Sequence, residues 1–261
     1  MSLPGGPHPR IDLNADMGEG FGAWAMGADA ELLAHVTSAN IACGFHAGDP
    51  TVIDRTVGLA ARAGVAVGAH PGYADLRGFG RRAIAADPQE VERDVLYQVG
   101  ALMAFARSHG TRLVHVKPHG ALYNQAAADA ALAGAVARGV ARAGKELVLV
   151  GLASSEPMRR AAEEAGLRFA AEAFADRAYE RDGTLRSRKL ERSMVEEPAA
   201  AAEQAVRIAR DGVVTAVDGS DVALRADTLC LHGDHPRAVA NARAVREALA
   251  SAGIDVRPLS A

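Results

Sequence analysis

Residues 38–50 read Ser-Ala-Asn-Ile-Ala-Cys-Gly-Phe-His-Ala-Gly-Asp-Pro, an apolar strand pattern that runs into the start of a helix. Side chains alternate along a strand, so one side of this run is apolar. The other side is small or polar and carries Asn40, Ala42, Gly44 and His46. Asp49 is a typical N-cap residue, and Pro50 suits the first position of a helix. The pattern predicts a strand that delivers His46 at its carboxyl end.

The same unit of strand, turn and helix repeats along the chain. Apolar runs predict strands at 11–14, 39–43, 65–69, 113–118, 146–150, 168–174 and 228–232. Helical patterns cover 29–36, 50–63, 88–109, 129–143, 155–165, 197–211 and 236–252. Helix stops are expected at Gly64, Gly110, Gly144, Gly166, Gly212 and Gly253.

Alternating strands and helices are typical of parallel βαβ units. We therefore expect an α/β fold that forms a closed or nearly closed barrel, with a doubly wound open sheet as the alternative. The segment 213–226, with Asp218-Gly219 at its middle, predicts an inserted hairpin.

Composition limits the class of protein. The chain has 261 residues, of which 49% are hydrophobic and 23% charged, and its net charge is -3. These values are ordinary for a globular protein and do not indicate a nucleic-acid or membrane surface. We expect a flexible leader at 1–9 and a single barrel domain at 10–261. Cys43 and Cys230 lie on predicted buried strands, as reduced thiols do, so we expect a cytoplasmic protein.

Polar side chains gather on one face of most predicted strands. Because helices cover the apolar outer face of such a barrel, the polar face points inward. Buried histidines and carboxylates are costly unless they are paired or bound to metal. Their position at strand carboxyl ends is typical of the active face of a barrel enzyme. The inward set is Asp12, Asn14, Asp16, Asn40, His46, His70, His115, Lys117, His119, Glu172, Asp176, Cys230 and His232.

Asp16 and Glu19 follow the first strand in a glycine-rich turn. A carboxylate here could bind metal, act as a general base or orient a histidine. The alternative is a turn carboxylate satisfied by backbone amides. The other polar strand ends favour a functional role.

His70 and His119 each lie at a strand end beside glycine and proline. With Asp16 they form a candidate two-histidine, one-carboxylate set for a divalent metal. The alternative is that both histidines bind substrate oxygens directly. The sequence leaves these two hypotheses equal, since the residues come from different strands.

Lys117 lies on the inward face between two histidines. Its ammonium could neutralise a phosphate or polarise a carbonyl. Arg81, in the Gly-Phe-Gly-Arg-Arg loop at 78–82, is a second candidate anion ligand, although this loop could also be an ordinary solvated basic loop. Asp234 is more simply explained as a helix N-cap than as a catalytic group. The chain has no Walker A loop, serine nucleophile elbow, CxxC pair or dinucleotide fingerprint.

Several long motifs resemble the LamB/YcsF family. They are Ile-Asp-Leu-Asn-Ala-Asp-Met-Gly-Glu-Gly (11–20), the opening stretch through Asp49, Gly-Ala-His-Pro-Gly (68–72), Gly-Phe-Gly-Arg-Arg (78–82), Tyr-Gln-Val-Gly-Ala-Leu (97–102), His-Val-Lys-Pro-His-Gly-Ala-Leu-Tyr-Asn (115–124), Phe-Ala-Asp-Arg-Ala-Tyr (174–179) and Cys-Leu-His-Gly-Asp (230–234). The motifs follow in the same order from Ile11 to the last helix. Residues 188–195 resemble the family least.

The resemblance implies a distorted seven-stranded barrel of the glycoside hydrolase/deacetylase type. It implies ATP-dependent opening of 5-oxo-L-proline to L-glutamate, with ATP and Mg²⁺ as co-substrate and 5-oxoprolinase subunits B and C as partners. Lys117 and Arg81 would then assist phosphate, and Asp16 or His46 would activate water. Fold relatives suggest a divalent metal at Asp16, His70 and His119.

The full set of candidate site residues has two parts. Those expected to act in catalysis are Asp16, His46, Lys117 and His119. Those expected to bind substrate are Asp12, Asn14, Asn40, His70, Arg81, Asp176 and His232. Two other classes remain open: a stand-alone metal-dependent deacetylase or amidohydrolase acting on a small amide or acetylated sugar, and a non-catalytic subunit.

Overall fold

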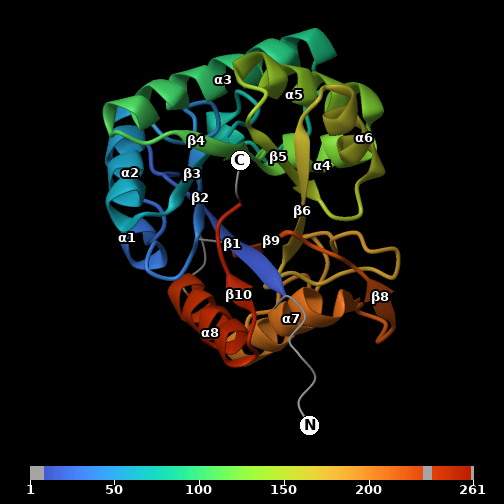
Figure 1. Cartoon of the computed structure of the whole chain (residues 1–261). Coiled ribbons are helices and arrows are strands. Elements are labelled where there is room, and N and C mark those ends of the chain that lie inside the picture. Colours follow the sequence, from blue (N-terminus) through green and yellow to red (C-terminus); the bar gives the residue numbers. More distant parts are fainter. Residues whose placement is uncertain (1–8, 232–236, 260–261) are drawn as a thin grey trace.

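The strands close into a parallel barrel, as the computed structural model shows for residues 9–231 and 237–259 (Figure 1). Neighbouring strands follow the order β1, β2, β3, β4, β5, β6 and β9, and β9 pairs back with β1. This closed ring confirms the α/β barrel over the open sheet. Its strands are β1 (Arg10–Met17), β2 (Ser38–Ala42), β3 (Ala66–His70), β4 (Leu113–Val116), β5 (Val148–Leu152), β6 (Arg168–Phe174) and β9 (Thr228–Leu231).

Helices surround this barrel on the outside (Figure 1). They are α1 (Asp29–Leu32), α2 (Pro50–Ala63), α3 (Pro88–Ser108), α4 (Gly120–Ala128), α5 (Ala130–Ala143), α6 (Glu156–Glu164), α7 (Pro198–Asp211) and α8 (Ala238–Ser251). A short 3-10 helix covers Leu76–Gly78. The predicted hairpin is confirmed as β7 (Val213–Thr215) paired antiparallel with β8 (Asp221–Ala223).

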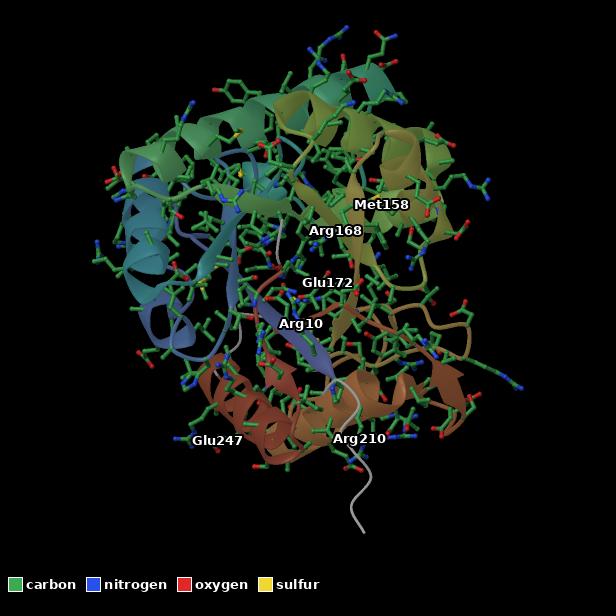
Figure 2. All side chains as sticks on the ribbon, in the orientation of Figure 1. Arg10, Met158, Arg168, Glu172, Arg210 and Glu247 are labelled. Atoms are coloured by element: carbon green, nitrogen blue, oxygen red, sulfur yellow. The ribbon has the colours of Figure 1, made fainter. Side chains whose placement is uncertain are left out.

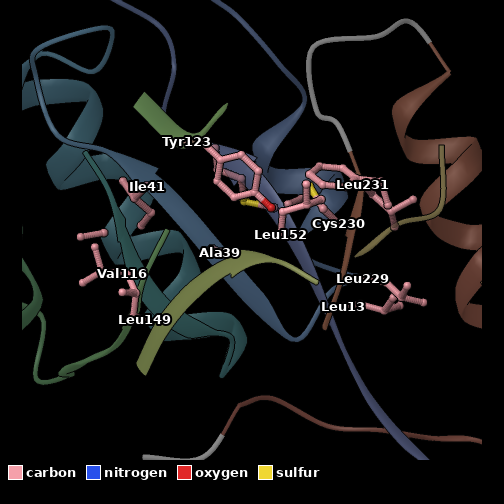
Figure 3. Close-up of a cluster of buried hydrophobic side chains, with 14 of the residues drawn as sticks. Leu13, Ala39, Ile41, Val116, Tyr123, Leu149, Leu152, Leu229, Cys230 and Leu231 are labelled. Carbon is pink, nitrogen blue, oxygen red and sulfur yellow. The ribbon is translucent and has the colours of Figure 1, made fainter. Parts of the chain in front are cut away.

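The main hydrophobic core lies between the barrel strands and the helices. Leu13 pairs in register with Leu229, and Val116 with Leu149, and all four side chains are buried (Figure 3). Charged side chains of the outer helices point away from the barrel, as Arg210 and Glu247 do in Figure 2. Because the outward face of the strands carries this core, their inward face can hold polar groups.

The helix start predicted at 49–50 is confirmed. Asp49 accepts hydrogen bonds from the backbone N–H groups of Thr51 (2.8 Å) and Val52 (3.1 Å), and Pro50 begins α2. The helix ends at Gly64, whose φ of 67° is left-handed, as the glycine stop predicts. Gly144 differs from the expected stops, because its φ of 178° is extended backbone.

The amino ends of the strands are closed by the C-terminal segment. After α8, β10 (Asp255–Val256) pairs with Arg10 and Ile11 at the start of β1. Leu259 then packs against Val148, Val150 and Ala170 on the inner face. Apolar side chains therefore pack at this end of the barrel, beside a small cavity that Leu259 also lines.

Some elements differ from the sequence expectation. The fifth strand begins and ends two residues later than predicted, because Gly151 continues the strand instead of stopping it. A Cβ at Gly151 would lie 2.9 Å from the Phe169 ring, so glycine here serves side-chain packing. The helix α4 and the strand β10 were not predicted. The expected leader, 1–9, lies outside the described residues except for Pro9, whose carbonyl oxygen accepts from Asp255 N–H (2.9 Å).

Across the described part of the chain, no helix combines the length and the apolar character needed to cross a membrane.

Candidate active site

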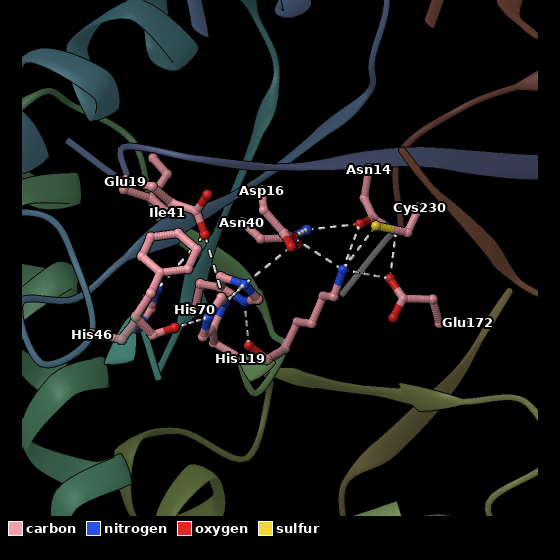
Figure 4. A network of polar contacts seen from close by, with 12 residues as sticks. Asn14, Asp16, Glu19, Asn40, Ile41, His46, His70, His119, Glu172 and Cys230 are labelled. Carbon is pink, nitrogen blue, oxygen red and sulfur yellow. Dashed lines mark hydrogen bonds and ion pairs between the residues drawn. The ribbon is translucent and has the colours of Figure 1, made fainter. Parts of the chain in front are cut away.

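Lys117 lies at the centre of the polar barrel interior. Its Nζ is 2.9 Å from Glu172 Oε1 and 3.0 Å from Asp16 Oδ1, and the side chain is 3% exposed. Nζ also donates to Asn14 Oδ1 (3.3 Å) and to Cys230 Sγ (3.0 Å). Figure 4 shows Asn14, Asp16, Glu172 and Cys230 close together, with dashed lines marking their contacts. Three strands, β1, β6 and β9, therefore supply partners to one buried ammonium.

Burial alone would lower the pKa of Lys117, but the carboxylates of Asp16 and Glu172 raise it well above its usual value. The ammonium is therefore charged at neutral pH. Burial raises the pKa of the Cys230 thiol well above its usual value, although Lys117 opposes this shift. The cation is consequently balanced by carboxylates and not by a thiolate.

Two asparagines hold the acidic partners in place. Asn14 Nδ2 donates to Glu172 Oε1 (3.0 Å). Asn40 Nδ2 donates to Asp16 Oδ1 (2.8 Å) and to Asn14 Oδ1 (2.7 Å). His115 Nε2 in turn lies 2.7 Å from Asn40 Oδ1. The network fixes the side-chain positions around Lys117 before any ligand binds.

His115 can reach Asn40 only because residue 68, on the intervening strand, is glycine. A Cβ at Gly68 would overlap the imidazole of His115. Burial, followed by the charge of Lys117, lowers the pKa of His115 to about 3. The ring is therefore neutral at physiological pH.

Three further histidines gather beside Asp16. The rings of His46 and His119 stack with centroids 3.8 Å apart, and His70 meets both rings edge-on. Glu19 Oε1 lies 3.8 Å from His46 Nε2 and 3.6 Å from His119 Nδ1. Burial lowers the pKa of His119 to about 3 and that of His46 well below its usual value. Figure 4 shows this cluster and the lysine network joined through Asp16.

A cavity of about 540 Å³ opens above these groups. Asp16, His70, Lys117 and His119 line its floor. Its rim is basic, with Arg81, Arg177, Arg186, Arg188 and Lys189. Burial, and then the nearby Arg188 charge, lower the pKa of Arg177 to about 10. The cavity therefore suits an anionic ligand.

The loop after β6 carries most of this basic rim. Arg177 is buried and donates to the backbone oxygens of Ser193 (3.2 Å) and Arg186 (2.7 Å). Arg186 forms an ion pair with Glu180 (2.8 Å). The arginine at 177 thus organises the loop that presents Arg188 and Lys189.

Most candidate residues gather at one end of the barrel. Some line the cavity, and others lie beneath or behind the residues that line it. Arg81, Lys117, His119, His70 and Asp16 line the cavity. Asn14 and Asn40 lie below them and contact Lys117 or Asp16. His46 is fully buried behind the His119 ring, and Asp176 is buried next to the cavity residue Arg177. His232 and Asp234 lie outside the described residues.

His46 reaches this cluster by a route that the alternation pattern did not predict. The strand β2 ends at Ala42, and Gly44 (φ 96°) turns the chain out of the extended conformation. The residues that follow β2 therefore form a loop, which carries His46 back to His119.

Asp12, expected to bind substrate, lies apart from this cavity, and its proposed role stays a prediction. Its carboxylate accepts hydrogen bonds from Thr37 (2.7 Å), Ser38 (2.7 Å) and Thr228 (2.5 Å). It lines a separate cavity of about 320 Å³ near the amino ends of the strands. The alternation pattern assigns a residue to a face, but it does not say how deep in the barrel the residue lies.

The structure brings to the site three residues that the list of catalytic and substrate-binding candidates left out, although the sequence already indicates Glu19 as a metal ligand or base and Glu172 as an inward-facing residue. Glu172 lies on the predicted inward face and contacts Lys117. Glu19 joins the histidine cluster, and Tyr123 lines the cavity from the unpredicted helix α4. The Arg-Ser-Arg-Lys sequence at 186–189 is the signal that could have indicated the basic rim.

Comparisons with known proteins agree with the motifs. The LamB/YcsF family model matches residues 11–261. The A subunit of 5-oxoprolinase from Methylococcus capsulatus is 57% identical over 249 residues, covering 95% of this chain and 95% of that one. The Bacillus subtilis protein of the same name is 50% identical and covers 96% of this chain and 97% of its own. A lactam utilization protein from Thermus thermophilus has a crystal structure with a TM-score of 0.91 and 51% identity, covering 96% of this chain and 100% of that one. The chain belongs to the LamB/YcsF family.

Proposed function

We propose that this chain opens the lactam ring of 5-oxo-L-proline in an ATP-dependent reaction that yields L-glutamate. Relatives named as the A subunit of 5-oxoprolinase, at 50–57% identity, support the substrate. The observation that carries the chemistry is the buried ammonium of Lys117, placed between Asp16 and Glu172 on the floor of a cavity with a basic rim.

An unstrained lactam is a poor electrophile, so coupling to ATP solves a chemical problem. Transfer of the γ-phosphoryl group to the lactam oxygen releases ADP and makes the ring carbon electrophilic. Water adds to that carbon, the C–N bond breaks and the nitrogen gains a proton, which leaves γ-glutamyl phosphate. A second water molecule releases phosphate, so each turnover consumes 5-oxoproline, ATP and two water molecules.

The residues match the charges that develop in this sequence. Lys117 would stabilise negative charge on the oxygen at the reacting carbon, because its ammonium is fixed and desolvated. Asp16, which lines the cavity, is the candidate general base for water. His46, the other candidate from the sequence, is fully buried against the His119 ring and does not line the cavity. Arg81 and the loop residues Arg188 and Lys189 would bind the phosphoryl group and the substrate carboxylate.

We further propose that the reaction requires two partner subunits, B and C, with ATP bound as its Mg²⁺ complex. The relatives are named as one lettered subunit of an enzyme, which supports an assembly of several chains. The basic rim would receive the phosphorylated substrate. The cytoplasm, where ATP is available, is the proposed compartment.

The test measures glutamate and ADP from 5-oxoproline and ATP, with this chain alone and with subunits B and C. We expect both products to appear in step only in the full mixture. Asp16→Asn preserves the shape of the side chain and should reduce glutamate formation at least about 100-fold. Unchanged glutamate formation with this variant would reject Asp16 as the base. Glutamate formation by subunits B and C without this chain would assign the chemistry to those partners.

The basic rim has its own test. The double variant Arg188→Gln/Lys189→Gln should raise KM for 5-oxoproline about tenfold, equivalent to ~1.4 kcal/mol of lost binding, with a smaller change in kcat. Arg181→Gln is the matched control, because Arg181 is an exposed arginine of the same loop that does not line the cavity. Equal KM values for the two variants would contradict the assignment of this rim.

A second candidate is stand-alone, metal-dependent amide hydrolysis. The cluster of Glu19, His46, His70 and His119 favours it, because these residues could hold a divalent metal that activates water. Amide cleavage by the chain alone, without ATP and in proportion to added metal, would support this activity over the ATP-coupled one.

A further inference from the structure

The hydrogen bonds of His70 and His119 to backbone carbonyls turn one ring nitrogen of each residue toward the other. His70 Nδ1 lies 2.8 Å from the backbone oxygen of Lys117, and His119 Nε2 lies 2.8 Å from that of Phe79. A carbonyl oxygen only accepts, so each of these ring nitrogens carries the hydrogen. With one proton on each ring, His70 Nε2 and His119 Nδ1 would both carry a lone pair, and a hydrogen bond between them would need a second proton on one of the rings. They nevertheless lie 3.0 Å apart.

Two more donor atoms converge on the same point. His46 is fully buried, and neither of its ring nitrogens has a hydrogen-bond partner among the residues that the structure describes. Its Nε2 lies 3.8 Å from Glu19 Oε1, which is also 3.6 Å from His119 Nδ1. One ligand atom from each of Glu19, His46, His70 and His119 falls within 4.8 Å of all the others. Such a concentration of electron pairs requires a positive charge between them.

We infer that these four side chains bind one divalent transition-metal ion. Ligands on bonds of about 2.1 Å are separated by roughly 3.0–4.2 Å, which matches the three distances of 3.0, 3.6 and 3.8 Å. Three imidazoles and one carboxylate select zinc, cobalt, nickel or iron over magnesium and calcium, which prefer oxygen ligands. The carbonyl contacts of His70 and His119 are those that metal-bound histidines typically make through their second nitrogen.

The backbone around the cluster is shaped to hold the rings. A Cβ at Gly72 would lie 2.7 Å from His46 Nδ1, and one at Gly80 would lie 2.8 Å from His119 Cδ2. Any larger residue at these positions would displace the stacked rings. The site is therefore preorganised by glycines that the sequence motifs contain.

The ligand set differs from the one expected from the sequence. Asp16 Oδ1 contacts Lys117 (3.0 Å) and Asn40 (2.8 Å), and its Oδ2 approaches His70 Nε2, at 3.3 Å. Asp16 is not in the set of residues whose ligand atoms all converge, whereas Glu19 is. Glu19 therefore supplies the carboxylate, and Asp16 joins the metal site to the lysine network. This inference rests on the geometry of the cluster and does not depend on the proposed function.

The experiment measures metal binding directly. The full chain is freed of metal with a chelator, dialysed against Co²⁺ or Zn²⁺ and analysed for metal content. We expect about one ion per chain, with a visible d–d spectrum for Co²⁺ and an increase in Tm on binding. Glu19→Gln keeps the shape of the side chain and should weaken binding at least tenfold, whereas His109→Gln, a change at a histidine that contacts Asp54 instead, should not.

Far-UV circular dichroism of each metal-free variant confirms that it is folded. A second variant, His46→Gln, should also weaken binding and change the Co²⁺ spectrum. Substoichiometric metal in the wild-type protein, or a Co²⁺ spectrum unchanged in both Glu19→Gln and His46→Gln, would overturn the inference. The charge between His70 and His119 would then be a shared proton.

Discussion

A single ammonium, that of Lys117, separates two carboxylates inside the barrel: Asp16 at 3.0 Å and Glu172 at 2.9 Å. Replacing it by methionine leaves the fully buried Glu172 and the partly exposed Asp16 without their cation. We expect Lys117→Met to reduce the free energy of unfolding by about 3–5 kcal/mol, as for other broken buried pairs. Urea denaturation provides the measurement, with Lys145→Met at an exposed lysine as control.

Adding Glu172→Gln to Lys117→Met should recover part of the lost stability, since one of the uncompensated charges is removed. A double variant less stable than the sum of the single variants would contradict this account. The comparison separates the charge of Lys117 from its packing.

His115 predicts how stability depends on pH. Its folded-state pKa of about 3 lies below its usual 6.5, so between these values the unfolded chain binds a proton that the folded chain does not. Stability should therefore fall as pH decreases through this window, by up to about 1.4 kcal/mol per pH unit from this residue. His115→Gln should reduce the slope of unfolding free energy against pH between about 6.5 and 4. Equal slopes in both proteins would count against a neutral, buried His115.

At the scale of elements, two glycines have opposite roles. Gly68 in β3 leaves room for the His115 ring, whereas nothing lies within 4 Å of a Cβ built at Gly100 in α3. Gly68→Ala should destabilise the protein by at least about 1–3 kcal/mol through overpacking. Gly100→Ala should stabilise it by about 0.5–1 kcal/mol through helix propensity. Thermal unfolding of both variants provides the measurement, and the same sign for both would contradict the steric role of Gly68.

At the scale of the whole molecule, the amino-terminal end of the barrel should contribute to stability without contributing to the chemistry. Leu259 is 7% exposed and packs at the amino-terminal end of the barrel, and it does not line the cavity that holds Asp16 and Lys117. Leu259→Ala should cost about 2–3 kcal/mol of stability, and glutamate formation by the assembled complex should stay unchanged at about 25 °C. Leu76→Ala, at a leucine that is 43% exposed, is the stability control. Loss of activity without loss of stability would place Leu259 in the functional machinery.

Much of the architecture could be predicted from local patterns. Alternating apolar runs, the Asp49-Pro50 helix start and the left-handed glycine at 64 depend on neighbours in sequence, so they indicate the strands, the helices and the α/β barrel. The alternation of side chains along each strand also identified the inward face that carries Asn14, Asp16 and Lys117. These features follow from the geometry of a few consecutive residues.

Which residues on different strands come into contact could not be predicted from the sequence, because it depends on how the barrel closes. Alternation along β1 could not distinguish Asp12 from Asp16, because both face inward. Asp12 lies near the amino ends of the strands, whereas Asp16 lies at the cavity. Nor could alternation bring His46 to Glu19 and His119, because a loop with left-handed glycines intervenes. The local sequence thus determined which groups face inward. The tertiary fold determined which of them meet, because the distance between side chains on different strands depends on register and loop path, and neither is encoded in local periodicity.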